Sequence, residues 1–168
     1  MKHKYTLALD DIYLAPLTYE TCENYRRLRN HPDVRQWFMY KGDISEEQQR
    51  RWFEKYIKDP CDAMFAIFSS ESNEFIGANA IYNIDGNGLA EYGRIIIDPE
   101  LRGRGFGYKA TCAAILIARD QMNLQQLVLE VYDANQRAIS IYRKCGFIET
   151  GMVCDTCGIP MKVMKIEL

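Results

Sequence analysis

The sequence predicts one mixed α/β domain spanning residues 1–168, and three observations support this fold class. The length of 168 residues suits a single hydrophobic core. Strand-like and helix-like segments follow one another in the order β-α-α-β-β-β-α-β-α-β-β. No repeat, linker or low-complexity stretch divides the chain, so we expect these elements to share one core.

Composition narrows the range of functions. The chain is 48% hydrophobic and 26% charged, which is ordinary for a soluble globular protein. A net charge of −2 gives no electrostatic reason to expect a nucleic-acid partner. No apolar run reaches the roughly 20 residues of a membrane helix, and the N-terminus begins a strand pattern rather than a signal peptide. We therefore expect a cytoplasmic protein with no membrane partner.

The first elements are a strand and a helix. An apolar stretch over residues 7–17 predicts the strand, and Thr18 is placed to cap the helix that follows. That helix should end near His31, because Pro32 disfavours helical backbone in the residue before it. An apolar and aromatic patch then occupies residues 34–40.

A second helix begins at a capping box. Ser45 and Gln48 are spaced so that each side chain bonds the other's free backbone N–H. The helix should stop near Pro60, with one apolar face made of Trp52, Phe53, Tyr56 and Ile57.

Three strands follow in the middle of the chain. Residues 63–69 and 75–84 are separated by the polar turn 70–73, which is a hairpin signal. The turn 85–88 joins them to a third strand at 89–97.

A glycine-rich turn over residues 102–107 connects this third strand to a helix. Such a turn points several backbone N–H groups and the positive end of a helix dipole at one place, and Arg102 and Arg104 add positive charge. A pyrophosphate is the natural ligand. The helix should run from about Gly105 to Met122 with an apolar stripe of Tyr108, Cys112, Ile115, Leu116 and Met122.

The C-terminal part predicts a strand, a helix and two more strands. The first strand covers residues 127–131, and Asn135 begins a helix that ends at Gly146, the usual type of helix stop. Residues 147–168 should form two strands around a turn at 154–158.

Six cysteines raise the question of a metal site. Cys154 and Cys157 form a lone Cys-x-x-Cys, and a structural zinc site usually needs four ligands. His3 and His31 are the only histidines, so we expect the Cys-x-x-Cys to be a hairpin turn and the protein to bind no metal.

Two segments resemble one known family. Arg-x-x-Gly-x-Gly at 102–107, after Ile-Asp-Pro-Glu, resembles the pyrophosphate signature of the Gcn5-related N-acetyltransferases (GNAT), whereas the Walker pattern is absent. Residues 135–147 resemble that superfamily's Asn-x-x-Ala…Tyr-x-x-x-Gly-Phe segment. The resemblance implies an α+β fold: a mixed, mostly antiparallel sheet with helices on both faces. It also implies an N-acetyltransferase that uses acetyl-CoA.

The resemblance assigns the cofactor site. Pantetheine would lie between two splayed strands and pair with the backbone at Ile95 and Ile97. The pyrophosphate would bind at Arg102, Gly103, Arg104, Gly105, Phe106 and Gly107. Asn135 is either a plain helix N-cap or also a partner of a pantetheine amide.

Tyr142 and Glu91 are the candidate catalytic residues. Tyr142 occupies the superfamily's tyrosine position and would protonate the departing thiolate, although a core tyrosine is the alternative. Glu91 resembles the acidic residue of many members and would accept the amine's proton, unless it is an ordinary exposed carboxylate. Arg94 is either its salt-bridge partner or a substrate contact.

Residues 29–40 are the segment that indicates the substrate accepting the acetyl group, because they are rich in cationic and aromatic groups. This stretch is similar to two GNAT branches, the ribosomal-protein N-terminal acetyltransferases and the amino-sugar acetyltransferases of the pseudaminic-acid pathway. We expect a small-molecule amine, a nucleotide-linked amino sugar held by Arg29, His31 and Arg35. A protein N-terminus, a polyamine and a non-catalytic CoA-binding sensor are the alternatives, and the protein is a monomer or a homodimer.

Overall fold

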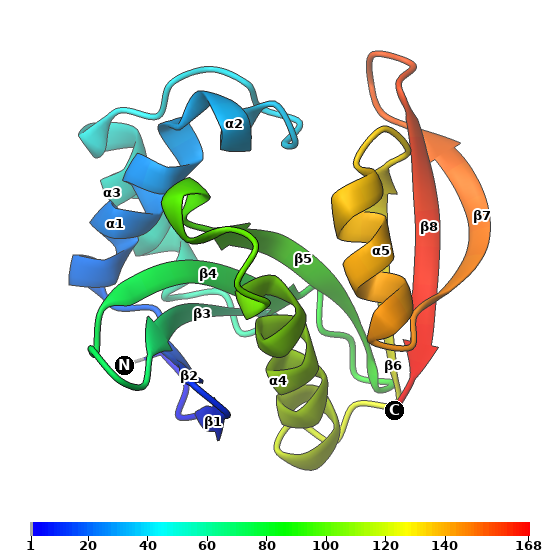
Figure 1. The fold of residues 1–168 in the computed structure, drawn as a ribbon, viewed down its shortest axis with the longest axis horizontal. Coiled ribbons are helices and arrows are strands. Elements are labelled where there is room, and N and C mark those ends of the chain that lie inside the picture. Colours follow the sequence, from blue (N-terminus) through cyan, green and yellow to red (C-terminus); the bar gives the residue numbers. More distant parts are fainter. Residues whose placement is uncertain (1) are drawn as a thin grey trace.

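The computed structural model describes residues 2–168, which form one eight-stranded sheet in the order β1-β2-β3-β4-β5-β6-β8-β7 (Figure 1). The strands are β1 (Leu7–Leu9), β2 (Ile12–Pro16), β3 (Asp62–Ser69), β4 (Phe75–Tyr82), β5 (Leu89–Ile97), β6 (Gln126–Tyr132), β7 (Ile148–Cys154) and β8 (Pro160–Glu167). The helices are α1 (Tyr19–Asn30), α2 (Pro32–Arg35), α3 (Glu46–Tyr56), α4 (Phe106–Asp120) and α5 (Gln136–Lys144), with a 3-10 turn at Pro99–Leu101. Neighbouring strands are antiparallel except β5 and β6, which confirms a mixed, mostly antiparallel sheet.

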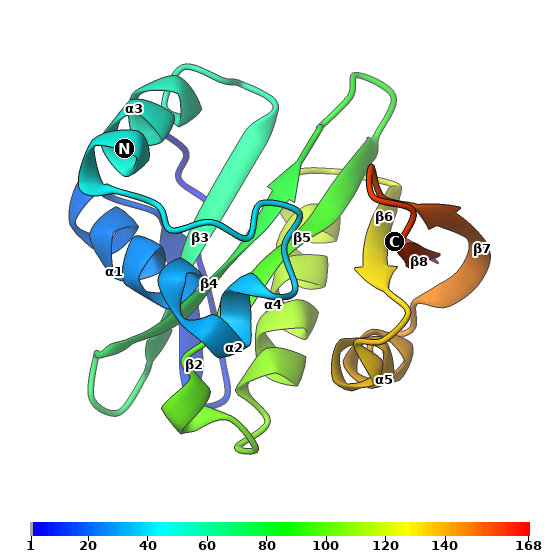
Figure 2. The ribbon, with the colours of Figure 1, turned by 90° about the horizontal axis from the view of Figure 1, so that it is seen from above.

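Each face of the sheet has its own hydrophobic core. Alternate residues of β3 separate the two cores: Phe65 packs under α4, whereas Met64 packs under α1 and α3. In Figure 2, α1 and α3 lie on one side of β3 and β4, and α4 lies on the other. The prediction of helices on both faces is therefore confirmed.

Two local predictions are wrong for physical reasons. The expected single strand over 7–17 is a tight hairpin of β1 and β2, because Asp10 adopts a positive φ of 53° and turns the chain. The predicted stripe of α4 is also displaced. Its buried face is made of small residues, which let the helix approach the sheet closely: Ala110, Thr111, Ala113, Ala114, Ile117 and Ala118.

Several helices begin where the capping residues in the sequence predicted. Thr18 caps α1, Ser45 and Gln48 form the expected capping box of α3, and Asn135 caps α5. The structure adds the short helix α2, which begins at Pro32 directly after α1 ends and overlaps the start of the predicted patch 34–40.

Candidate active site

A cleft of about 1030 Å³ opens where β5 and β6 separate. The two strands pair only through Leu89–Glu91 and Gln126–Val128, and Figure 1 shows them diverging beyond that point. One side of the cleft is lined by Asp33, Val34, Gln36, Trp37 and Phe38, and the other side by α5. Residues 95–97 of β5 and most of the segment 101–108 lie between them. Nine residues with predicted roles line it: Ile95, Ile97, Arg102, Gly103, Gly105, Phe106, Gly107, Asn135 and Tyr142.

A β-bulge in β5 precedes the cleft. Arg94 and Ile95 together lie opposite Asn79, and Arg94 has a positive φ of 52°. The Arg94 guanidinium pairs with Asp62 at 2.6 Å and lies over the Tyr82 ring at 4.2 Å. Arg94 is therefore the partner of Asp62 and not, as one of our alternatives had it, of Glu91.

The glycine-rich turn presents free backbone N–H groups to the cleft. Gly103 and Gly105 have φ values of 87° and 82°, which favour glycine. The first backbone hydrogen bond of α4 runs from the Lys109 N–H to the Gly105 carbonyl at 3.1 Å. The N–H groups before Lys109 in the turn therefore take no part in the helical hydrogen bonds of α4. Arg102 lines the cleft, and its Nη1 lies 3.9 Å from Asp33 of α2, whereas Arg104 is exposed and does not line it.

A buried network of hydrogen bonds connects this turn to the sheet. Thr111 donates to the Gly107 carbonyl at 2.8 Å, and its hydroxyl lies 3.0 Å from that of Tyr92. Asn79 then donates to the Tyr92 hydroxyl at 3.3 Å and to the Ala110 carbonyl at 3.1 Å. These residues were not predicted from the sequence, because a lone threonine or asparagine within an apolar segment does not indicate its partner.

Tyr142 and Asn135 lie on the α5 side of the cleft. The Asn135 side chain accepts a bond from the Ala138 N–H at 3.2 Å, which is the predicted N-cap. Tyr142 is only 6% exposed, packs edge-on against Tyr92, and its hydroxyl bonds to no other residue within 2–168. Burial raises the pKa of Tyr142, so the phenol keeps its proton at neutral pH.

Glu91 lies outside the cleft lining, on the sheet face opposite α4. It accepts a bond from Asn83 at 2.8 Å and stands opposite Tyr82 in the ladder. Glu130 shares that face, since Glu91 pairs with Val128 and side chains two residues apart on a strand point the same way. Burial raises the pKa of Tyr82, and both carboxylates raise it further. Sequence reasoning missed Glu130, which only the strand register brings beside Glu91.

The three predicted acceptor residues do not converge. Arg29 is 7% exposed and its guanidinium lies 3.6 Å from the Phe38 ring centroid, and burial lowers its pKa. His31 accepts from the Asp33 N–H at 3.2 Å and caps α2. Arg35 pairs with Asp43 at 2.6 Å. Each already has a partner within the protein, and none of the three lines the cleft.

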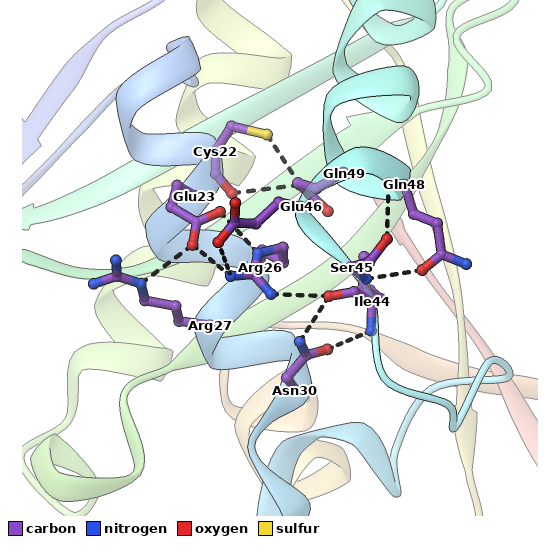
Figure 3. A network of polar contacts seen from close by, with 10 residues as sticks. All are labelled: Cys22, Glu23, Arg26, Arg27, Asn30, Ile44, Ser45, Glu46, Gln48 and Gln49. Carbon is purple, nitrogen blue, oxygen red and sulfur yellow. Dashed lines mark hydrogen bonds and ion pairs between the residues drawn. The ribbon is translucent and has the colours of Figure 1, made fainter.

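The segment that carries these residues is fastened at its far end (Figure 3). Asn30 donates to the Ile44 carbonyl at 2.9 Å and accepts from the Ile44 N–H at 2.8 Å, as a paired strand would. Arg26 donates to the same carbonyl at 2.9 Å and bonds Glu23. The end of the loop between α2 and α3 is therefore bonded to α1.

The described residues form neither a metal-ligand cluster nor a membrane-spanning helix. Within residues 2–168, no three His, Cys, Asp or Glu side chains come together as potential metal ligands. None of the helices described there has the length and apolar character to cross a membrane. Cys154 and Cys157 are exposed in the predicted turn, where the Asp155 N–H donates to the Ile159 carbonyl at 3.0 Å.

Comparison with known proteins defines the class. A family model described as an acetyltransferase (GNAT) domain matches residues 11–148. The chain therefore belongs to the GNAT acetyltransferase family, as the two sequence signatures predicted. It is an acetyl-CoA-dependent N-acetyltransferase, with acetyl-CoA as the co-substrate.

Several relatives are spermidine acetyltransferases. Spermidine N(1)-acetyltransferase of Escherichia coli strain K12 is 30% identical over 145 residues, which cover 83% of this chain and 74% of the relative. The Vibrio cholerae enzyme of the same name is 26% identical over 133 residues, covering 76% and 73%. Mycothiol acetyltransferase of Salinispora tropica is 26% identical over 141 residues, and the match spans 82% of this chain and 41% of that longer protein.

Solved structures share the fold. Spermidine N-acetyltransferase from Vibrio cholerae in complex with CoA and spermine superposes with a TM-score of 0.85 at 24% identity, covering 94% of this chain and 95% of that one. A GNAT acetyltransferase from Bacillus anthracis gives 0.83 at 15% identity, covering 97% and 98%. The same fold is therefore built from very different sequences.

Proposed function

We propose that this chain transfers the acetyl group of acetyl-CoA to a primary amine of a small polyamine. The observation that carries the proposal is the cleft at the β5–β6 separation, which combines free backbone N–H groups with the unpartnered Tyr142 hydroxyl. The cleft fits a long, thin ligand with an anionic end. A side chain at Gly103 or Gly105 would need a backbone conformation that side chains rarely adopt, so the turn keeps its N–H groups open.

Different residues of the cleft would bind different parts of acetyl-CoA. The N–H groups at 103–107 and the Arg102 guanidinium would hold the pyrophosphate, with Arg104 adding charge at the rim. Main-chain groups at Ile95 and Ile97 have no β6 partner and would pair with the pantetheine amides. Asn135 uses its oxygen for the cap, which leaves its amide N–H₂ for the ligand.

The proposed chemistry needs one proton donor and one acceptor. Acetyl-CoA supplies an acetyl thioester, whose sulfur needs a proton when the acetyl group leaves. Tyr142 holds such a proton at its hydroxyl, inside the cleft. Glu91 would receive the amine's proton from the opposite face, through water, because its carboxylate does not line the cleft.

Charge on the acceptor face supports a polyamine. Neither Glu91 nor Glu130 forms an ion pair within residues 2–168, because Arg94 is committed to Asp62. Two uncompensated carboxylates on one face attract a substrate with several ammonium groups. The spermidine acetyltransferase relatives point to the same class.

The amino-sugar alternative has weaker support. It relied on Arg29, His31 and Arg35 meeting a diphosphate, and these groups are partnered within the protein. The relatives therefore favour the polyamine over the amino sugar we first expected.

The test is thiol release from acetyl-CoA with spermidine, spermine, a nucleotide amino sugar and an N-terminal peptide measured side by side. We expect the polyamines to be preferred, with a KM that rises with salt. Glu130→Gln should raise the spermidine KM about fivefold, because removing a charge from a cation site costs roughly one kcal/mol. Glu54→Gln, an exposed change on α3, serves as the matched control. Acetylation of the sugar or peptide with none of the polyamines would contradict the proposal.

A further inference from the structure

Two cysteines far apart in the sequence meet beside the cleft. The sulfurs of Cys112 in α4 and Cys145 at the end of α5 lie 3.7 Å apart, and both residues are half-buried. The Cys145 thiol also lies 3.8 Å from the Tyr108 carbonyl. No other two cysteine sulfurs within residues 2–168 are in contact, so this pair stands apart from the exposed Cys61, Cys154 and Cys157.

We propose that Cys112 and Cys145 form a reversible disulfide, a modification site that joins α4 to α5. A disulfide needs an S–S separation of about 2.05 Å, so the sulfurs must approach by roughly 1.7 Å. Both cysteines lie on helices that already pack together: a Cβ at Gly107 of α4 would meet Ile141 of α5 at 3.3 Å. Closing the bond requires rotation of the two side chains and a shift of the helices that carry them.

Hydrogen peroxide is the oxidant that balances this step. The Cys112 thiolate attacks the peroxide, which gives a sulfenic acid on Cys112 and releases hydroxide. The Cys145 thiol then displaces water from that sulfenic acid and forms the S–S bond. Two thiols and one peroxide thus give one disulfide and two waters. Burial raises the pKa of Cys145, which suits it to the second step rather than the first.

The position of the pair gives the bond a consequence for catalysis. Cys112 lies one turn after Tyr108, and Cys145 lies three residues after Tyr142, and both tyrosines line the cleft. Drawing the end of α5 toward α4 displaces Tyr142 from its resting position. This consequence rests on the proposed function, whereas formation of the bond does not.

The experiment uses the full chain with Cys61, Cys154 and Cys157 changed to Ser, which leaves the pair and the buried Cys22. Burial raises the pKa of Cys22 to about 11, so it stays a thiol and acts as an internal reference. Peroxide should remove two of the three denatured-state thiols and join the Cys112 and Cys145 peptides in a mass spectrum. Cys112→Ser and Cys145→Ser, each in that background, should form no such link.

Activity separates this inference from the proposed function. With the bond complete, turnover at saturating acetyl-CoA and amine should fall about tenfold, because misplacing a catalytic group by an ångström is costly, and dithiothreitol should restore it. No linked peptide, or a linked protein with unchanged turnover, would overturn the inference. A reduced protein without acetyltransferase activity toward any amine would instead count against the proposed function, since thiol loss is measured independently.

Discussion

Tyr142 combines a buried ring with a hydroxyl that no residue within 2–168 engages. Buried tyrosine hydroxyls usually find a partner, because an unmade hydrogen bond costs free energy. The neighbouring Tyr92 shows the usual arrangement, with its hydroxyl bonded to Asn79 and near Thr111. The Tyr142 hydroxyl therefore has the surroundings expected of a group that acts on a ligand.

Removing only that hydroxyl is the sharpest test of the catalytic proposal. Tyr142→Phe should lower turnover about 10²-fold or more, because the departing thiolate loses its proton donor. The acetyl-CoA dissociation constant and the unfolding free energy should change little, since the hydroxyl bonds to no residue within 2–168. Calorimetry and denaturation of the same sample give these controls, and near-normal turnover would return Tyr142 to a core-packing role.

Asp62 and Arg94 hold the bulge of β5, and their pairing is a testable part of the fold. The Asp62 side chain is 11% exposed, so Asp62→Ala would leave the partly buried Arg94 guanidinium without its carboxylate partner. The substitution should destabilise the protein by about 3 kcal/mol. Urea denaturation measures the loss. Asp120→Ala, which breaks the exposed pair with Arg119, should give no measurable change. Equal effects of the two substitutions would show that the buried pair has no special role.

Sequence reasoning predicted which helix residues line the cleft better than it predicted the partners of loop residues. Asn135 and Tyr142 belong to one helix, so their spacing alone puts them on the same wall of the cleft. Arg29 and Arg35 were expected to meet a ligand, but they met Phe38 and Asp43 instead. A side chain's partner in a loop depends on the tertiary fold, which local patterns do not contain.

Among the elements, α4 begins at the cleft, and Gly105 at its N-cap is the position to test. Its φ of 82° means that Gly105→Val strains the turn and displaces the N–H groups that follow. The acetyl-CoA dissociation constant, measured by calorimetry, should rise at least tenfold, or about 1.4 kcal/mol.

A second glycine provides the control for this prediction. A Cβ at Gly86 would meet nothing within 4 Å, and its φ is not positive, so Gly86→Val should leave the affinity unchanged. Unchanged affinity in a folded Gly105→Val protein would place the pyrophosphate elsewhere.

The elements themselves were predictable where the signal was local. Capping residues and glycine stops fixed the start of α3 and the end of α5. The bulge at Arg94 was not predictable, because it exists only through pairing with β4. The buried face of α4 was misjudged since it consists of alanines, and apolar patterns give more weight to large side chains.

At the scale of the whole molecule, six tyrosines give stability a marked dependence on alkaline pH. Burial raises the pKa of each one above its unfolded value near 10: Tyr25, Tyr56, Tyr82, Tyr92, Tyr132 and Tyr142. Above about pH 10 the unfolded chain releases these protons and the folded protein keeps them, so stability falls as pH rises. Each tyrosine contributes a slope of about 1.4 kcal/mol per pH unit.

This prediction can be measured by urea midpoints between pH 7 and 11. The contribution of the tyrosines to the free energy of unfolding should be nearly constant up to pH 9 and then decline steeply. Tyrosinate absorbance should appear only when the protein unfolds. Tyr142→Phe should make the decline shallower by one group. An identical slope in that variant would mean that Tyr142 ionises in the folded protein.

The narrow junction between β5 and β6 makes the molecule divisible. Only Leu89–Glu91 and Gln126–Val128 pair across it, so β1–β5 and β6–β8 each keep complete ladders of their own. The two parts share an apolar contact in which Leu127, Leu129 and Ile139 face the alanines of α4. A chain cut after Met122 therefore loses little of either half, and we expect fragments 1–122 and 123–168, expressed together, to reassemble and regain acetyltransferase activity. The strand separation that forms the cleft is therefore also the place where this enzyme can be divided into two fragments. Fused to two interacting proteins, such fragments would regain activity only when those proteins bind each other.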